Sequence, residues 1–107
     1  MFLYPFVEVV KLIVVSISTT GITVDGHAGY AESGRDIVCA AVSALTQTLI
    51  AGIEGLTDDR IGYEIKPGKV NIVFENLSKQ AQLLVDSFFI GISEVITAYG
   101  DNYVRFI

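Results

Sequence analysis

Cysteine and histidine are scarce in this chain, since its 107 residues include only one of each, Cys39 and His27. One cysteine cannot form a disulfide within the chain, so we expect a reducing compartment and a cytoplasmic protein. The same scarcity leaves too few soft ligands for a metal site. We therefore expect no bound metal.

Basic residues are also few, with 7 Lys and Arg against 12 Asp and Glu, and the net charge is −5. So few cations cannot form a surface that neutralises nucleic-acid phosphates, and we expect no nucleic-acid partner. Only 18% of the residues are charged and 51% are apolar, which excludes a disordered chain. Length and composition predict one folded domain, residues 1–107, with its own core.

Motifs of several enzyme classes are absent. Gly26, Gly29 and Gly34 do not form the GxGxxG or GKS/T pattern of a phosphate-binding loop. Ser33 and Ser43 lack the context of a nucleophile elbow, and the scattered carboxylates do not indicate an acid–base pair. These absences leave the thiol and the imidazole as the candidates for chemistry, and no pattern indicates a cofactor.

The first 18 residues, MFLYPFVEVVKLIVVSIS, are mostly apolar, but they fit neither a signal peptide nor a membrane span. No basic residue precedes the apolar run, and Glu8 and Lys11 interrupt it. The run is also too short and too charged to cross a bilayer, so we expect no membrane partner. Its valines and isoleucines predict a strand within residues 7–18, central in the sheet over Val9–Val15.

Turn residues and periodicity predict the next two elements. After a break at Thr20-Gly21, the alternation over Ile22–Asp25 indicates a half-buried strand. Asp36 is a good N-cap for a helix that continues to about Ile53. Because this helix has few charges, we expect it to be covered on most sides.

A β-hairpin is the clearest element in the sequence. Two alternating segments, Ile61–Lys66 and Lys69–Phe74, flank Pro67 and Gly68. Proline and glycine occupy the two central positions that a type II turn favours. The sequence therefore predicts two antiparallel strands here.

The last part of the chain predicts a helix and a closing strand. The helix starts at Asn76 or Ser78 and runs to about Tyr99 with three- and four-residue apolar spacing, and Gly100 follows as its C′ residue. Residues 103–107 alternate as a strand. The order is ββαββαβ, and the predicted class is α+β: a mainly antiparallel sheet of about five strands with two helices on one face.

The second helix carries apolar residues outside its main stripe. Leu83, Phe89 and Ile90 widen its apolar surface beyond what one sheet face needs. We expect them to form a homodimer interface. The alternative is a helix buried deeply within one chain.

The thiol and the imidazole lie 12 positions apart, with glycines between them. Asp36 as the N-cap would place Cys39 in the first helical turn, where free N–H groups and the helix dipole stabilise a thiolate. His27 follows Gly26 at the end of the second predicted strand. It could act as the base for the Cys39 thiol if the two side chains come within hydrogen-bond reach. The alternatives are a buried, inert cysteine and a surface histidine.

Residues 26–47, GHAGYAESGRDIVCAAVSALTQ, resemble the signature of the bacterial ribosomal-processing cysteine protease family, Prp. The similarity lies in Gly26-His27-Ala28, Gly34, the run from Asp36 to Ala40, and Ser43. Outside this signature most of the chain is similar as well. The apolar lead of residues 1–6 departs from the family pattern.

The resemblance implies an endopeptidase that removes a short hydrophobic N-terminal extension from a large-subunit ribosomal protein. Cys39 would be the nucleophile and His27 its general base, with Asp36 and Ser43 in support or orientation. Gly26 and Gly34 match family positions beside the site. Residues 28–35 would form a mobile cover that shifts to admit the peptide.

Two other functions stay open on the residues alone. A non-enzymatic dimeric module could bind a ribosomal protein or an assembly intermediate and keep Cys39 buried. A thiol redox sensor is the third alternative, but the chain has no resolving cysteine.

Overall fold

The computed structural model describes residues 11–32 and 34–107. Seven elements follow one another in the predicted order: β1 (Ile13–Ile17), β2 (Gly21–Asp25), α1 (Ile37–Leu56), β3 (Gly62–Lys66), β4 (Lys69–Val73), α2 (Lys79–Tyr99) and β5 (Val104–Phe106). The order ββαββαβ is therefore confirmed.

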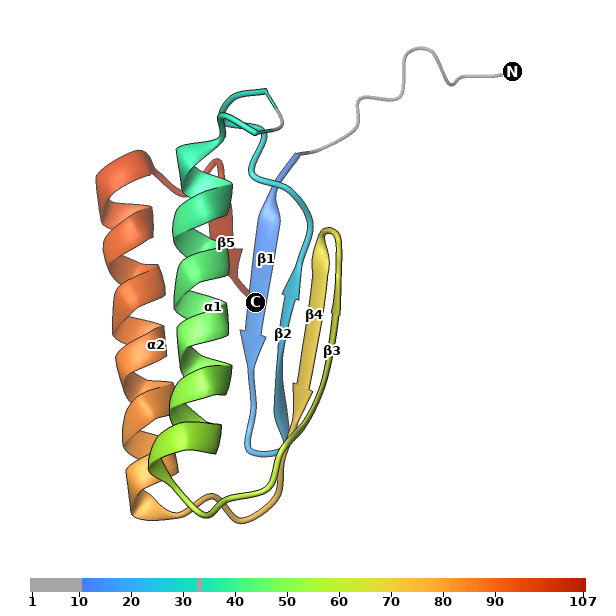
Figure 1. Ribbon diagram of the computed structural model, residues 1–107. Coiled ribbons are helices and arrows are strands. Elements are labelled where there is room, and N and C mark those ends of the chain that lie inside the picture. The colour runs from blue at the N-terminus through green and yellow to red at the C-terminus, as the bar shows by residue number, and fades with distance from the viewer. Residues whose placement is uncertain (1–10, 33) are drawn as a thin grey trace.

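The molecule has two layers, with α1 and α2 side by side on one face of a five-stranded sheet (Figure 1). The strand order is β3-β4-β2-β1-β5, and all pairs are antiparallel except β1 with β5. The predicted class, a mainly antiparallel α+β sheet with both helices on one face, is confirmed. The loop before α1 and the turn between β3 and β4 lie at the same end of the molecule, the upper end in Figure 1.

Side-chain caps fix where both helices begin. Asp36 Oδ1 accepts hydrogen bonds from the first turn of α1, as predicted. Ser78 caps α2, since its hydroxyl accepts from the Ala81 N–H at 3.1 Å. Each cap satisfies N–H groups that have no partner within the helix, which stabilises a helix by about 1 kcal/mol.

Three details of the predicted elements differ from the structure. The helix α1 extends to Leu56, three residues beyond the predicted end. It is also covered on one side only, because its outer face consists largely of small Ala, Ser and Thr side chains that need no cover. The first strand begins at Ile13 and ends at Ile17, and residues 7–10 of the prediction lie outside the described part.

The core lies between the sheet and the helices. Every second residue of β1 and β2 points into it, including Val15 and Ile22, which are almost completely buried. Val38, Ile53 and Ile92 meet them from the two helices. Each such side chain contributes roughly 1.5–3 kcal/mol by leaving water, so this layer holds both helices on the sheet.

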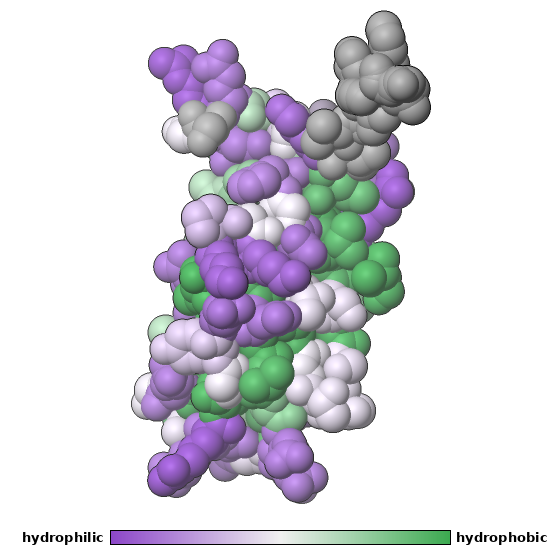
Figure 2. Space-filling view, turned by 90° about the vertical axis from the view of Figure 1, so that its right-hand side faces the viewer, coloured by the Kyte–Doolittle hydropathy of each residue, from purple (hydrophilic) through white to green (hydrophobic). Residues whose placement is uncertain are grey.

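The β3–β4 hairpin lies at the edge of the sheet, and every residue of β3 is exposed. Figure 2 looks onto the sheet side of the molecule and shows hydrophilic and hydrophobic residues mixed along it. Pro67 and Gly68 form the two-residue turn, and Gly68 has the positive φ, +71°, that the predicted type II turn requires at this position. The hairpin thereby ends beside the start of α1.

Both helices are long and apolar enough to cross a membrane by length and composition alone. The core helices of soluble proteins meet the same criterion. Here each helix buries one side in the core that it shares with the sheet.

Candidate active site

The end of β2 and the start of α1 bring all the predicted site residues together. One cavity of about 650 Å³ is lined by Gly26, His27, Gly34, Asp36, Cys39 and Ser43. A second cavity, of about 410 Å³, lies between α1 and the β3–β4 turn and shares four of these residues, Gly26, His27, Cys39 and Ser43. The six residues predicted from the sequence therefore lie together in the structure.

Cys39 is the third residue of α1 and is half-buried. The Ala28 N–H, from the loop after β2, donates a hydrogen bond to its Sγ at 3.2 Å. Ala28 is itself almost completely buried. The loop after β2 therefore passes directly beside the sulfur.

Asp36 ties this loop to the helix. Its Oδ1 accepts from the N–H groups of Val38 at 3.0 Å and Cys39 at 2.9 Å. Its Oδ2 accepts from those of Tyr30 at 2.9 Å and Ala31 at 3.3 Å. Burial raises the pKa of the Asp36 carboxyl, but these four hydrogen bonds together outweigh it and hold the pKa below its ordinary value.

The Cys39 thiol is held in its neutral form in this arrangement. Burial is the main cause that raises its pKa, and the negative charge of Asp36 raises it further. Hydrogen bonds from the N–H groups of Ala28 and Gly29 act in the opposite direction and are outweighed. The helix start thus does not favour the thiolate as strongly as the sequence predicted.

Three N–H groups in the first turn of α1 are already hydrogen-bonded, which bears on where an oxyanion could be held. Those of Val38 and Cys39 donate to the Asp36 carboxylate, and that of Ala40 donates to the Asp36 carbonyl at 3.0 Å. An oxyanion formed in a reaction at Cys39 would need free backbone N–H groups beside the sulfur. In the present conformation these three have no free N–H for that purpose.

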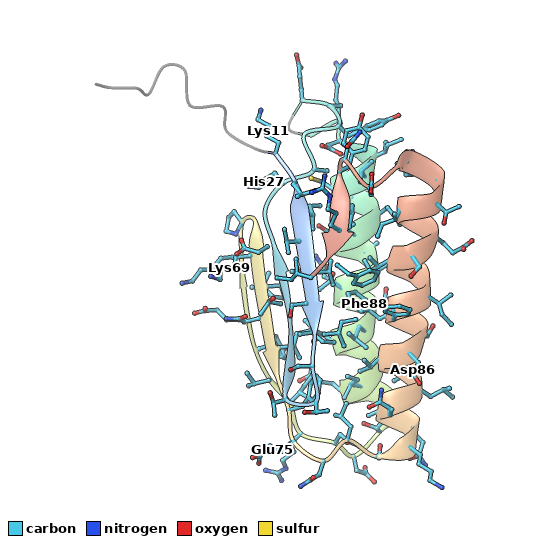
Figure 3. All side chains as sticks on the ribbon, turned by 180° about the vertical axis from the view of Figure 1, so that it is seen from behind. Lys11, His27, Lys69, Glu75, Asp86 and Phe88 are labelled. Carbon is cyan, nitrogen blue, oxygen red and sulfur yellow. The ribbon has the colours of Figure 1, made fainter. Side chains whose placement is uncertain are left out.

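His27 is exposed and lies in both cavities with Cys39. Figure 3 shows His27 and Lys11 at the same end of the molecule, away from Glu75. The imidazole of His27 packs against Gly68 of the hairpin turn. Within residues 11–32 and 34–107 no hydrogen bond joins His27 to Cys39, although both line the two cavities.

The supporting positions differ in what they do. Gly26 has a φ of +106°, and a side chain there would run into the Leu12 carbonyl, so only glycine fits. Gly34 also has a positive φ, +86°, but faces open space. Ser43 lies one turn after Cys39 and is exposed to both cavities.

Sequence reasoning missed an aromatic contact that holds the loop. The Tyr30 ring meets the rings of Tyr99 at 5.4 Å and Tyr103 at 5.1 Å between centroids, both edge to face. These residues lie about 70 positions apart in the sequence, so no local pattern could link them. Lys11, which also lines the larger cavity, was noted only as an interruption of the apolar run.

The site offers no alternative metal chemistry in the described residues. Among residues 11–32 and 34–107, no group of three or more His, Cys, Asp or Glu side chains could hold a metal ion. The Cys39 thiol and the His27 imidazole both line the site and could act as a nucleophile and a base.

Comparison with known proteins identifies the family. The family described as cysteine protease Prp matches residues 9–104. Two Staphylococcus aureus proteins, from strains Mu50 and NCTC 8325, are named ribosomal processing cysteine protease Prp; each is 33% identical over 86 residues, 78% of this chain and 81% of the relative.

Solved structures agree with this match. An S. aureus structure of an essential ribosomal processing protease Prp, in complex with a covalently linked product peptide, superposes with a TM-score of 0.78 at 26% identity, over 89% of this chain and 95% of that one. A Streptococcus mutans protein gives 0.73 at 26% identity, over 90% and 92%. Because the family match covers most of its length, the chain belongs to the Prp family of cysteine proteases.

Proposed function

We propose that this protein is a cytoplasmic endopeptidase that removes a short hydrophobic N-terminal extension from a large-subunit ribosomal protein. One observation carries the proposal: the only cysteine and the only histidine of the chain lie in one cavity, together with Gly26, Gly34, Asp36 and Ser43 of the family-like signature. The S. aureus relatives, which are named as ribosomal processing proteases, support the substrate class.

The second cavity fits an apolar peptide. Its walls include Ile13, Val24, Val42, Ile65 and Val70. These side chains come from β1, β2, α1 and the hairpin, and they line the same cavity as Cys39. An extended hydrophobic segment could place its side chains there while its backbone passes the sulfur.

In the proposed reaction, His27 takes the proton of the Cys39 thiol. The thiolate attacks the carbonyl carbon of the scissile bond, and the imidazolium gives its proton to the leaving amine as the C–N bond breaks. Water, activated by the neutral imidazole, then hydrolyses the thioester and restores the thiol. Because no hydrogen bond joins the two groups within residues 11–32 and 34–107, this proton transfer requires His27 to approach the sulfur.

The loop of residues 28–35 is the part that we expect to move. The Ala28 N–H now contacts the sulfur that the substrate must reach. Displacing this segment would open the sulfur to a peptide and let His27 approach it. Besides this Ala28 contact, the Asp36 carboxylate ties the loop to the start of α1 and the Tyr30 ring ties it to the end of α2. A substrate could replace these contacts one at a time.

We further propose that the protein acts as a homodimer. Leu83, Phe89 and Ile90 on α2 are exposed by 69%, 48% and 61%. Phe89 also stacks on Phe106 of β5 at 4.8 Å between ring centroids, which extends the apolar surface from the helix to the sheet edge. Such a surface is typical of a contact between subunits.

The direct test uses the extended N-terminus of the ribosomal protein as substrate. Wild-type protein should release the extension as a separate peptide, detected by mass, and Cys39→Ala should release none. Cys39→Ala is a small change at a half-buried position, so its thermal unfolding serves as the control for folding. Intact substrate after incubation with the wild type would leave binding without cleavage as the function, and cleavage by Cys39→Ala would remove Cys39 from the mechanism.

A further inference from the structure

The imidazole of His27 fits against a place where a side chain is missing. A Cβ built on Gly68 would lie 2.6 Å from His27 Nε2 and 3.0 Å from Cε1. Real Cβ atoms do not come this close to a ring atom, so any residue larger than glycine would displace the imidazole. The tip of the ring therefore occupies the space that Gly68 leaves free.

The backbone ties the same two places together. The Gly26 N–H donates to the Gly68 carbonyl at 2.7 Å, and His27 follows Gly26 directly. The pairing of Asp25 with Lys69 between β2 and β4 continues this ladder to the base of the turn. His27 and the turn are thus held in register by the sheet itself.

We propose that Gly68 is a positioning residue for His27. It acts through the imidazole, although it also lines the cavity that we assign to the peptide. This inference rests on the proposed function, in which His27 is the base. By leaving room for the ring tip and bonding to Gly26, Gly68 sets the position from which the imidazole approaches the Cys39 sulfur.

A simpler reason for glycine at this position can be separated from the proposed one. The φ of Gly68 is +71°, which by itself favours glycine in a turn. Asparagine also tolerates a left-handed backbone, but it carries a Cβ. Gly68→Asn therefore keeps the turn conformation accessible and introduces the contact with His27.

The test compares Gly68→Asn with a substitution at another glycine that has a positive φ but no neighbour. Gly100 has a φ of +97°, and a Cβ added to it would meet nothing within 4 Å, so Gly100→Ala strains the backbone without touching His27. In cleavage of the extended peptide, Gly68→Asn should lower kcat by about 10²-fold with KM unchanged, the usual effect of misplacing a catalytic group. Gly100→Ala should leave kcat unchanged.

A spectroscopic readout does not depend on the substrate. The chain has one histidine, so its ring protons give one set of NMR signals. Wild-type protein should show a nuclear Overhauser effect between these protons and the Gly68 α protons, and Gly68→Asn should shift the ring signals while Gly100→Ala does not. Absence of the effect in the wild type, or unchanged ring signals and kcat in Gly68→Asn, would overturn the proposal.

This design also separates the inference from the proposed function. If no peptide is cleaved but the nuclear Overhauser effect and the shifts appear, the ribosomal substrate is wrong and the positioning of His27 stands. If cleavage is normal in Gly68→Asn, the positioning role is wrong and the protease function stands. The wild-type measurement needs no variant, so poor folding of Gly68→Asn cannot hide the answer.

Discussion

Two connections that contain glycine reach the candidate site, and they are held in different ways. The loop between β2 and α1 is fixed by the Asp36 carboxylate and by the Tyr30 ring. The turn between β3 and β4 is fixed by the backbone ladder on both of its strands and by the bond from Gly26 to Gly68. The loop lies beside the thiol, and the turn lies beside the imidazole.

The difference suggests a division of roles between the two connections. Side-chain contacts at the surface can be exchanged for contacts with a peptide at little cost, so the loop can open. A turn closed by a sheet ladder cannot move without breaking several backbone hydrogen bonds. We therefore expect the substrate to displace the cover of Cys39 while the turn stays fixed, so that the imidazole approaches the sulfur from its position beside Gly68.

The largest expected effect comes from removing the His27 imidazole, which packs against the turn between β3 and β4. His27→Ala should lower kcat for cleavage of the extended peptide by about 10²–10⁴-fold, the usual contribution of a general acid–base. Because His27 is exposed, the midpoint of urea unfolding should stay near that of the wild type. Unchanged cleavage by this variant would mean that another group deprotonates the thiol.

Asp36 links the loop to the helix, and two substitutions separate its roles. Asp36→Ala removes the N-cap and should destabilise the fold by about 0.5–2 kcal/mol in urea unfolding. Asp36→Asn keeps a good N-cap and removes the charge, so it should cost much less stability. Both variants should lower the pKa of the Cys39 thiol, because the Asp36 charge raises it.

The pKa change can be measured as the pH dependence of Cys39 alkylation by iodoacetamide. In both Asp36 variants the rate should rise at a lower pH than in the wild type. An unchanged profile in Asp36→Asn would show that burial alone sets the thiol pKa. Equal stability of Asp36→Ala and wild type would show that the cap and the loop contacts contribute nothing.

Removing the Tyr30 ring, the other contact that fixes the loop, should have a smaller effect than the substitutions at His27 and Asp36. Tyr30→Ala removes two edge-to-face ring contacts, each worth about 0.5–1.5 kcal/mol beyond area burial. We expect faster amide hydrogen exchange over residues 28–31 and unchanged exchange in β3 and β4. Tyr63→Ala, on the exposed strand β3, is the matched control and should leave the loop unaffected. If the loop amides stay protected from exchange in Tyr30→Ala, the Asp36 hydrogen bonds would be sufficient to hold the loop in position.

The smallest effect concerns acid stability. The pKa of Asp36 is lowered in the folded state, so its contribution is present above the unfolded pKa and is lost as the pH falls through the folded value. Urea unfolding between about pH 5 and pH 2, a window that lies around the ordinary carboxyl value, should therefore show a shallower loss of stability in Asp36→Asn than in wild type. Some slope should remain because hydrogen bonds from Ser78 also lower the pKa of Asp59. Identical slopes would show that Asp36 is not selectively stabilised as a carboxylate.

The parts of the fold that local chemistry determines were accessible from the sequence. Asp36 as a cap, the Pro67-Gly68 turn and the apolar spacing of α2 each depend on residues a few positions apart. The outer face of α1 was misjudged because a lack of charge was taken as a sign of cover. Small residues such as alanine and serine are tolerated on either side of a helix.

The site could be predicted as a set of residues but not as a geometry. Its members come from one short segment, which the family resemblance covers. The contact between His27 and Gly68 depends on the register of β2 with β4, and the contact of Tyr30 with Tyr99 depends on where α2 ends. Both contacts arise from packing between residues far apart in the sequence. The periodicity of a single helix or strand carries no information about such contacts.

The central claim, that Cys39 carries the reaction, can be tested on the unmodified chain because it has no other thiol. Partial alkylation with iodoacetamide gives samples whose modified fraction is read by intact mass, and each sample is then assayed on the extended ribosomal peptide. We predict that cleavage falls in direct proportion to the fraction of modified Cys39 and reaches zero at complete modification. Fully alkylated protein that still releases the extension would contradict the account.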